Sequence, residues 1–304
     1  MSENENDNEC TYCDIMFANA GRTSKSKLPG LIRELLPHRG GDQMRFVLDV
    51  GCADGRFTRC LKNSLPDDVG VIGLEPNRQR YRKAQKLMDG DGRLSFINNQ
   101  FDNSYADGRG DFDCILFSSS MHEISSACPD KIDRYTTIPI RVALKKAAGL
   151  LRKDGVVVVR DFVKVCNWEY GSVEVVFTTE EIENQFLRYV RECPFIDYGG
   201  SFVFSMSKVY QKQAIFKIRA DLFLEFMLCR TWGENAWKRE VKERKLILSK
   251  EMWKTAFEEA GLTDVTAETH TEEYPDFFKN AAFVVSPAGW SWPDLSITIT
   301  GRKK

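Results

Sequence analysis

The sequence predicts an α/β protein in which a doubly wound, mostly parallel sheet is covered by helices on both faces. Between residues 44 and 162, strand-like and helix-like segments alternate. The strand-like segments are continuous apolar runs such as VGVIGLE at 69–75, which is typical of strands buried on both faces. A tight turn of small residues, GCADG at 51–55, directly follows the first of these runs, as in many sheets of this class.

The elements of this core follow one another in a regular order. A short amphipathic helix at 27–38 precedes the first strand. A glycine ends the helix before the fifth strand. We expect strands at 44–50, 69–75, 93–99, 111–119 and 156–162, with helices at 54–65, 77–88 and 140–155.

The alternation stops after the fifth strand and returns near residue 250. Residues 178–190 carry a capping box from Thr178 to Glu181 and apolar residues at helical spacing. Residues 213–228 carry a second apolar stripe, which predicts a helix. The sequence therefore predicts a helical insertion after the fifth strand. A helix at 249–261 and strands at 264–271 and 295–303 are expected to complete the core sheet.

The composition excludes several classes of protein. The chain has 304 residues, of which 42% are hydrophobic, so it can bury a substantial core. Its formal net charge of -1 weakens the case for a protein whose whole surface binds nucleic acid. No apolar run approaches the ~20 residues needed to cross a bilayer. The nine scattered cysteines indicate free thiols, so we expect a cytoplasmic protein without membrane contact.

The polar, acidic N-terminus is expected to form a flexible tail. Cys10 and Cys13 in this tail form a lone CxxC, whereas a zinc site needs a second pair of ligands, so no metal site is expected. The predicted division of the chain is a tail at 1–25, a core at 26–163, the insertion at 164–249 and the last part of the core at 250–304.

The turn of small residues indicates the kind of ligand. Gly51 and Gly55 lack side chains where a ligand would approach the backbone, and Ala53 is almost as small. The dinucleotide fingerprint G-x-G-x-x-G does not fit, because its third glycine is missing. The pattern in DVGCADG instead resembles motif I of the class I S-adenosylmethionine-dependent methyltransferases, with alanine in place of the middle glycine.

The resemblance covers about 45–165 and implies a Rossmann-like fold. It also implies which residues bind the cofactor. Glu75 ends the second strand, where an acid of this family accepts hydrogen bonds from both ribose hydroxyls. Gln100 and Phe101 match the family's adenine contact, although Phe101 is equally consistent with a core position. The implied cofactor is S-adenosylmethionine, with S-adenosylhomocysteine as product. The expected contacts are Asp49, Gly51, Cys52, Ala53, Gly55, Glu75, Pro76, Gln100, Phe101 and Ser118.

The same resemblance places the chemistry at the ends of the fourth and fifth strands. His122, in SSSMHEI, would lie beside the methyl group, as a general base or only as an orienting group. Glu123 would orient the imidazole ring or cap the next helix. Arg160 and Asp161 leave the fifth strand facing the same cleft and are expected to contact substrate. Arg160 would bind an acidic substrate or pair internally with Asp161. Serines at 118–120 argue against a divalent metal held as in catechol-type methyltransferases.

The insertion is expected to act as a lid that selects the substrate. Trp232 and Trp237 occur among arginines and lysines and would form a pocket wall, or belong to an amphipathic helix with a solvated charged face. The sequence thus predicts in-line methyl transfer to an oxygen or nitrogen of a small-molecule acceptor. Two alternatives stay open: an RNA or tRNA methyltransferase that uses the basic run from Lys238 to Lys245, and a catalytically inactive, cofactor-binding regulatory subunit.

Overall fold

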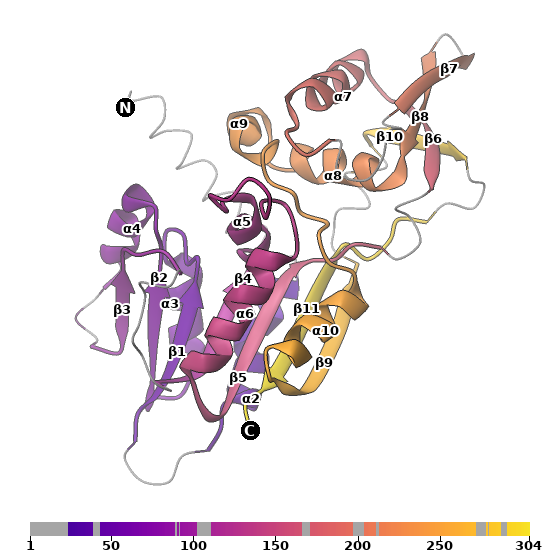
Figure 1. The fold of residues 1–304 in the computed structure, drawn as a ribbon. Helices are drawn as coiled ribbons and strands as arrows, with labels where there is room; N and C mark the ends of the chain where they lie inside the picture. The colour runs from indigo at the N-terminus through magenta and orange to yellow at the C-terminus, as the bar shows by residue number, and fades with distance from the viewer. Residues whose placement is uncertain are drawn as a thin grey trace.

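The chain forms a large sheet with helices on both sides and a smaller unit of strands and helices beyond one end of that sheet (Figure 1). None of the described helices has the length and apolar character needed to span a membrane. Of the predicted tail, only Ser24 and Lys25 are described, so the CxxC of Cys10 and Cys13 lies outside the described residues. The computed structural model describes residues 24–38, 43–88, 90, 92–101, 111–165, 171–196, 204–210, 213–271, 278, 280–286 and 291–304.

Seven strands form the large sheet in the order β3-β2-β1-β4-β5-β11-β9. Neighbouring strands pair in parallel except at β11, which runs antiparallel to both β5 and β9. The predicted, mostly parallel sheet is therefore confirmed. The strand order reverses between β1 and β4, which is where sheets of this kind bind ligands. The strands are β1 (Arg45–Val50), β2 (Val69–Leu74), β3 (Leu94–Ile97), β4 (Phe112–Ser118), β5 (Leu151–Phe162), β9 (Thr263–His270) and β11 (Ser296–Arg302).

Helices cover both faces of this sheet, as its continuous apolar strands predict. Along β5, Val156 and Val158 pack into one core cluster and Val157 and Val159 into another, because successive side chains point to opposite faces. The first cluster lies under α2 (Leu28–Leu35), α3 (Arg56–Ser64) and α4 (Arg78–Gln85), and the second under α5 (Met121–Ser126), α6 (Ile138–Leu150) and α10 (Lys250–Glu259).

The boundary between α6 and β5 differs from the prediction. The helix predicted at 140–155 ends at Leu150, and the strand begins at the next residue. Leu151 pairs with Phe112 of β4, and Asp154 donates its backbone N–H to the carbonyl of Lys303. Pairing with chain segments on both sides thus overrides the helical pattern of this stretch.

The segment predicted as a helical insertion contains strands as well as helices, so that prediction was only partly right. Its strands form an antiparallel sheet in the order β10-β6-β8-β7, whose edge strand β10 comes from the C-terminal part of the chain. Residues 250–304 therefore complete both sheets and not the core alone. The elements of this smaller unit are β6 (Ser172–Phe177), α7 (Glu180–Glu192), β7 (Phe204–Tyr210), β8 (Gln213–Arg219), α8 (Ala220–Arg230), η2 (Glu234–Ala236), α9 (Trp237–Glu240) and β10 (Ala282–Ser286).

Two local predictions in this unit need correction. The helix expected over 213–228 is strand β8 in its first half, because that stretch pairs with β6 and β7 on its two sides. The cap of α7 is Thr179, whose hydroxyl accepts the N–H of Ile182, and not Thr178. Thr178 instead donates its hydroxyl to the carbonyl of Asn280, at 2.8 Å.

Candidate active site

The turn after β1 holds three residues in left-handed backbone conformations. Gly51, Ala53 and Gly55 have φ angles of 77°, 52° and 78°. A Cβ on Gly51 would lie 2.7 Å from Cβ of Ser120, and one on Gly55 would lie 2.7 Å from the ring of Phe96. Both positions therefore require glycine for backbone and packing reasons. Ala53 adopts the left-handed conformation at an energetic cost, at the position where the resemblance expects glycine.

Glu75 follows β2 and faces this turn. One carboxylate oxygen accepts the backbone N–H of Ala53 at 2.9 Å, and the other accepts that of Asn77 at 2.8 Å. Burial is the main reason that the pKa of Glu75 is raised, to about 7. Asn98, which the sequence analysis did not select, donates its amide to the carbonyls of Glu75 and Pro76 at 2.8 and 3.0 Å. The carboxylate is thus fixed beside the glycine turn.

Asp49 and Lys25 also lie near this turn. Asp49 is buried at the end of β1 and accepts a hydrogen bond from the hydroxyl of Thr58 at 2.7 Å; burial raises its pKa. Lys25 lies in η1 (Ser24–Lys27), with Nζ 4.5 Å from the centroid of the Phe57 ring. Burial lowers the pKa of Lys25 to about 8, against the opposing charge of Asp49. Lys25 fell in the predicted tail, where no sequence signal marks it.

The remaining predicted cofactor contacts differ in burial. Cys52 is buried in the turn, and Ser118 ends β4 with a buried hydroxyl that has no hydrogen-bond partner among the described residues. Such an unsatisfied hydroxyl is a group that a ligand can satisfy. Gln100 is exposed. Phe101 is buried edge-on against Phe117, with ring centroids 5.2 Å apart, which is a core position.

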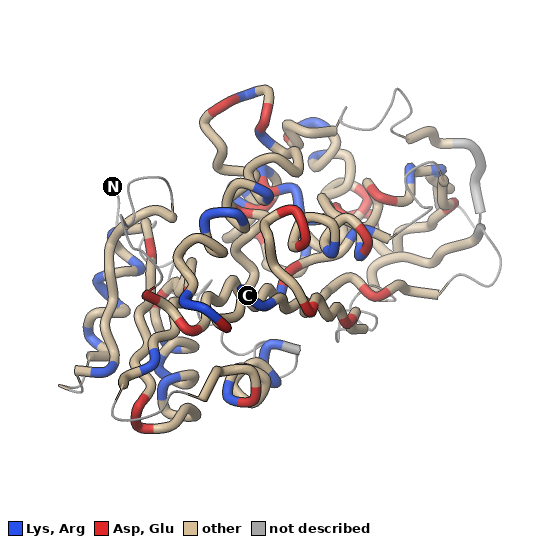
Figure 2. Tube along the Cα trace, turned by 60° about the horizontal axis from the view of Figure 1, so that its bottom comes forward, with Lys and Arg blue, Asp and Glu red and all other residues tan. Residues whose placement is uncertain are grey.

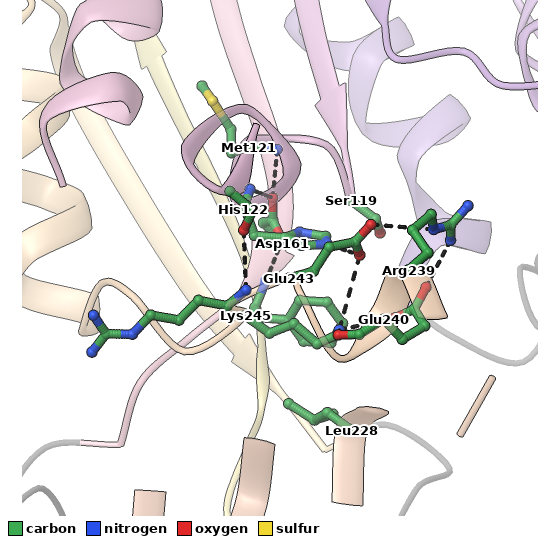
Figure 3. A network of polar contacts seen from close by, with 12 residues as sticks. Ser119, Met121, His122, Asp161, Leu228, Arg239, Glu240, Glu243 and Lys245 are labelled. Carbon is green, nitrogen blue, oxygen red and sulfur yellow. Dashed lines mark hydrogen bonds and ion pairs between the residues drawn. The ribbon is translucent and has the colours of Figure 1, made fainter. Parts of the chain in front are cut away.

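The ends of β4 and β5 bring His122 and Asp161 together. Nδ1 of His122 lies 2.7 Å from Oδ1 of Asp161, whose Oδ2 accepts the backbone N–H groups of Met121 and His122 (Figure 3). Burial alone would lower the pKa of His122, but the charge and hydrogen bond of Asp161 outweigh it and raise the pKa to about 9. The ligand-free imidazole is therefore protonated at neutral pH, which favours an orienting role over that of general base.

The other residues predicted on the acceptor side take separate positions. Arg160 is buried and donates from Nη1 to Oγ of Ser119 at 2.6 Å, whereas Asp161 bonds His122. Of the two alternatives for Arg160, the internal pair with Asp161 therefore does not form. Successive residues of a strand point to opposite faces, which explains the separation. Glu123 is half-buried, and its carboxylate lies close to His122 and Glu243.

The segment after α9 contributes side chains that the sequence analysis missed. Oε2 of Glu243 lies 3.8 Å from Nε2 of His122, and its Oε1 lies 3.2 Å from Nε of Arg239 (Figure 3). Buried Lys245 pairs with Glu240 at 2.9 Å. Burial, followed by the charge of Glu240, raises the pKa of Glu243 to about 7. The acids Glu240 and Glu243 interrupt the basic run at 238–245, and this was the sequence signal that could have marked the segment. That they point inward depends on the fold.

The basic run at 238–245 is not a continuous exposed stripe. Glu240, Val241 and Lys245 are all buried. Figure 2 shows basic and acidic residues interspersed along the described trace, without a separate basic region. The run therefore does not form the row of cations that would follow a phosphate backbone.

The two tryptophans predicted to contact substrate differ in burial. Trp237 is buried, its indole N–H donates to Glu192 at 2.7 Å, and the guanidinium of Arg188 lies 4.8 Å from its ring centroid. Trp237 therefore belongs to the core of the smaller unit and not to a pocket wall. Trp232 is half-buried just beyond α8.

Comparisons with known proteins identify the family of the chain. A family model described as a methyltransferase domain matches residues 22–267. No curated protein sequence matches the chain significantly. Solved structures similar to the chain include a methyltransferase of Thermotoga maritima described as a possible histamine N-methyltransferase, with 17% identity and a TM-score of 0.47, which covers 98% of this chain and 95% of that one.

Two further structures are similar at the same level. The YcgJ protein of Bacillus subtilis has 13% identity and a TM-score of 0.47, with 91% of this chain and 97% of that one covered. The carbon methyltransferase DszA has 14% identity and a TM-score of 0.49, with 92% of this chain covered. The chain spans only 54% of the length of DszA.

The matched range of the family model contains the glycine turn, Glu75, His122, Asp161 and Glu243. It extends over most of the chain and includes most of the smaller unit. The chain therefore belongs to the methyltransferase domain family, that of the class I S-adenosylmethionine-dependent methyltransferases.

Proposed function

We propose that this protein transfers the methyl group of S-adenosylmethionine to an oxygen or nitrogen atom of a small molecule. The observation that carries the proposal is the buried carboxylate of Glu75, which the N–H groups of Ala53 and Asn77 hold beside a turn that requires glycine at positions 51 and 55. A carboxylate offers acceptors only, so it is suited to two ribose hydroxyl donors.

The residues around the turn suit the other parts of the cofactor. Asp49 would face its amino group, and the ammonium of Lys25 would face its carboxylate. The unpartnered hydroxyl of Ser118 is available at the end of β4. When bound, S-adenosylmethionine supplies a methyl group that its sulfonium activates.

The chain's own contribution to the reaction is orientation. In an in-line displacement the acceptor atom bonds to the methyl carbon as the carbon–sulfur bond breaks, and good alignment is worth ~7–11 kcal/mol in intramolecular models. His122 would orient the acceptor by hydrogen bonding, with Asp161 as its positioning residue. Glu123 and Arg160 would bind polar groups of the acceptor on either side.

The smaller unit would cover the acceptor. Its segment after α9 brings Glu243 to His122, so this unit forms one side of the acceptor site. The inward folding of 238–245 favours a small molecule over RNA as acceptor. The free thiols of Cys52, Cys60 and Cys114 support our proposal of a reducing, cytoplasmic location.

Two measurements test the proposal. Calorimetry should show binding of S-adenosylhomocysteine by the full chain, and no binding would refute the proposal. Radiolabelled S-adenosylmethionine incubated with fractionated cell extract should then label the small-molecule fraction. Label in the RNA fraction would favour an RNA methyltransferase, and cofactor binding without transfer to any fraction would favour a regulatory subunit.

A further inference from the structure

His122, Glu123 and Glu243 direct one ring nitrogen and two carboxylates toward one point. One atom of each lies within 4.8 Å of the others. His122 and Glu123 belong to α5, whereas Glu243 follows α9, so two elements far apart in the sequence meet here (Figure 3). His122 is 5% exposed, so this point is largely shielded from water.

Asp161 determines which nitrogen of His122 faces this point. Nδ1 of His122 lies 2.7 Å from Oδ1 of Asp161, so Nε2 is the nitrogen that faces this point, and a bound metal ion would take the place of a proton on Nε2. Nε2 lies 3.8 Å from Oε2 of Glu243, beyond the reach of a hydrogen bond. Two carboxylates beside one ring nitrogen favour a cation held between the three groups.

The neighbouring basic side chains each pair most closely with Glu240. Nε of Arg239 lies 3.2 Å from the far oxygen of Glu243, Oε1. Nζ of Lys245 pairs with Glu240 at 2.9 Å and remains 4.0 Å from Oε2 of Glu243. Four acids, Glu123, Asp161, Glu240 and Glu243, act electrostatically on this point, against the basic side chains of Arg239, Lys245 and His122 itself.

We propose that a divalent transition-metal ion binds here, through Nε2 of His122 and the carboxylates of Glu123 and Glu243. Asp161 would complete the carboxylate–histidine–metal arrangement that orients the ring of a metal-bound histidine. One imidazole and two carboxylates suit Zn²⁺ or Mn²⁺ better than Mg²⁺, which prefers an all-oxygen shell.

Three protein ligands leave coordination positions open for a further group. An oxygen or nitrogen of the methyl acceptor would bind there and be polarised by the ion, a role that rests on the proposed function. The serines at 118–120, which argue against a catechol-type metal site, do not bear on this one, because its ligands come from α5 and from the segment after α9.

Titration of the metal-stripped full chain with Mn²⁺, followed by the electron paramagnetic resonance signal of the free ion, tests the site. We expect one Mn²⁺ bound per chain, with Mg²⁺ as a weak competitor. Glu123→Gln should weaken binding at least about tenfold. The carboxylate of Glu123 makes no hydrogen bond within the described part of the chain, so this variant should fold normally. Glu258→Gln, at an exposed position of α10, is the matched control and should bind like the wild type.

Two results would overturn the site. One is the absence of bound Mn²⁺ at millimolar ion concentration. The other is binding that Glu123→Gln and Glu243→Gln both leave unchanged, which would assign the ion to an unrelated surface acid. The readout requires neither cofactor nor acceptor, so failure of this site leaves the binding of S-adenosylhomocysteine intact. Conversely, if S-adenosylhomocysteine does not bind, the proposed function is refuted, but the Mn²⁺ titration still tests the metal site.

Discussion

The glycine turn after β1 and the cluster around His122 lie at the same edge of the sheet but are built in different ways. The turn consists of consecutive residues, and its shape depends on their left-handed backbone and on the missing side chains of its glycines. The cluster consists of charged side chains from three separate segments, represented by His122, Asp161 and Glu243. A site of the first kind can be recognised in a sequence, whereas a site of the second kind depends on the fold that joins its parts.

The two sites also differ in what stabilises them. Steric fit holds the turn, so its stability should respond strongly to an added carbon atom and weakly to pH. Mutual neutralisation of buried charges holds the cluster, so it should respond to pH. Four predictions test this contrast, from the largest expected effect to the smallest.

The steric side is tested most strongly by Gly51→Ala. The new Cβ would lie 2.7 Å from Cβ of Ser120, on a backbone with φ of 77°. We expect a loss of about 3–4 kcal/mol in the free energy of unfolding, from left-handed strain and overpacking together. Urea denaturation measures it. Gly149→Ala in α6, where a Cβ meets no atom within 4 Å, is the control and should be neutral or slightly stabilising. Equal effects at both positions would contradict the steric account.

The electrostatic side is tested by the pH dependence of stability. The pKa of His122 is raised from 6.5 to about 9, so its charge contributes stability that is fully present below pH 6.5 and is lost as pH rises through about 9. The expected loss is about 3 kcal/mol across this window. Urea denaturation at a series of pH values, with a chelator present, measures it in wild type and in His122→Gln. The same slope in both proteins would show that another group titrates.

Glu75 links the two kinds of site, because it is a charged group held by the backbone of the turn. Glu75→Gln should weaken S-adenosylhomocysteine binding about 10–100-fold, through loss of hydrogen bonds to a charged acceptor. Since the pKa of Glu75 is raised to about 7, wild-type affinity should also fall as pH drops below 7, when the acceptor is protonated. Calorimetry at several pH values measures both effects. Glu34→Gln, at an exposed position of α2, should bind normally. A pH dependence that persists in Glu75→Gln would assign the titration to another group.

The smallest effect concerns Ala53, which departs from the glycine that the family motif expects. Its φ of 52° is strained for alanine, so Ala53→Gly should stabilise the protein by about 0.5–1 kcal/mol. Thermal unfolding measures the change. The same substitution at Ala148 in α6 should be destabilising by about 1 kcal/mol or more. A destabilising Ala53→Gly would mean that the methyl group of Ala53 has a packing role that outweighs the strain.

The errors in the sequence-based prediction have a common origin. Residues 213–219 have the apolar content of a helix, yet they form β8 because strands lie on both sides of them. Trp237 lies among charged residues in the sequence, which suggested a binding role, yet its indole N–H bonds Glu192 within the smaller unit. In each case the partner that determines the outcome lies far along the chain, and single-segment patterns do not contain it.

Several residues selected from local motifs lie together in the structure. Gly51, Gly55 and Glu75 meet at the edge of the sheet because adjacent parallel strands end there. His122 and Asp161 meet for the same reason at the ends of β4 and β5, although the sequence did not indicate that they pair. Lys25 and Glu243 were missed, since each reaches its site from a segment outside the core alternation.

The sequence by itself determined the parallel core, the glycine turn and the acid that follows β2, because backbone sterics and strand order act over short stretches of chain. Only the tertiary structure decided that strands from both ends of the smaller unit form a second sheet, and that Glu243 faces His122. Buried charges need partners of opposite sign, and the identity of those partners depends on which distant segments the fold brings together.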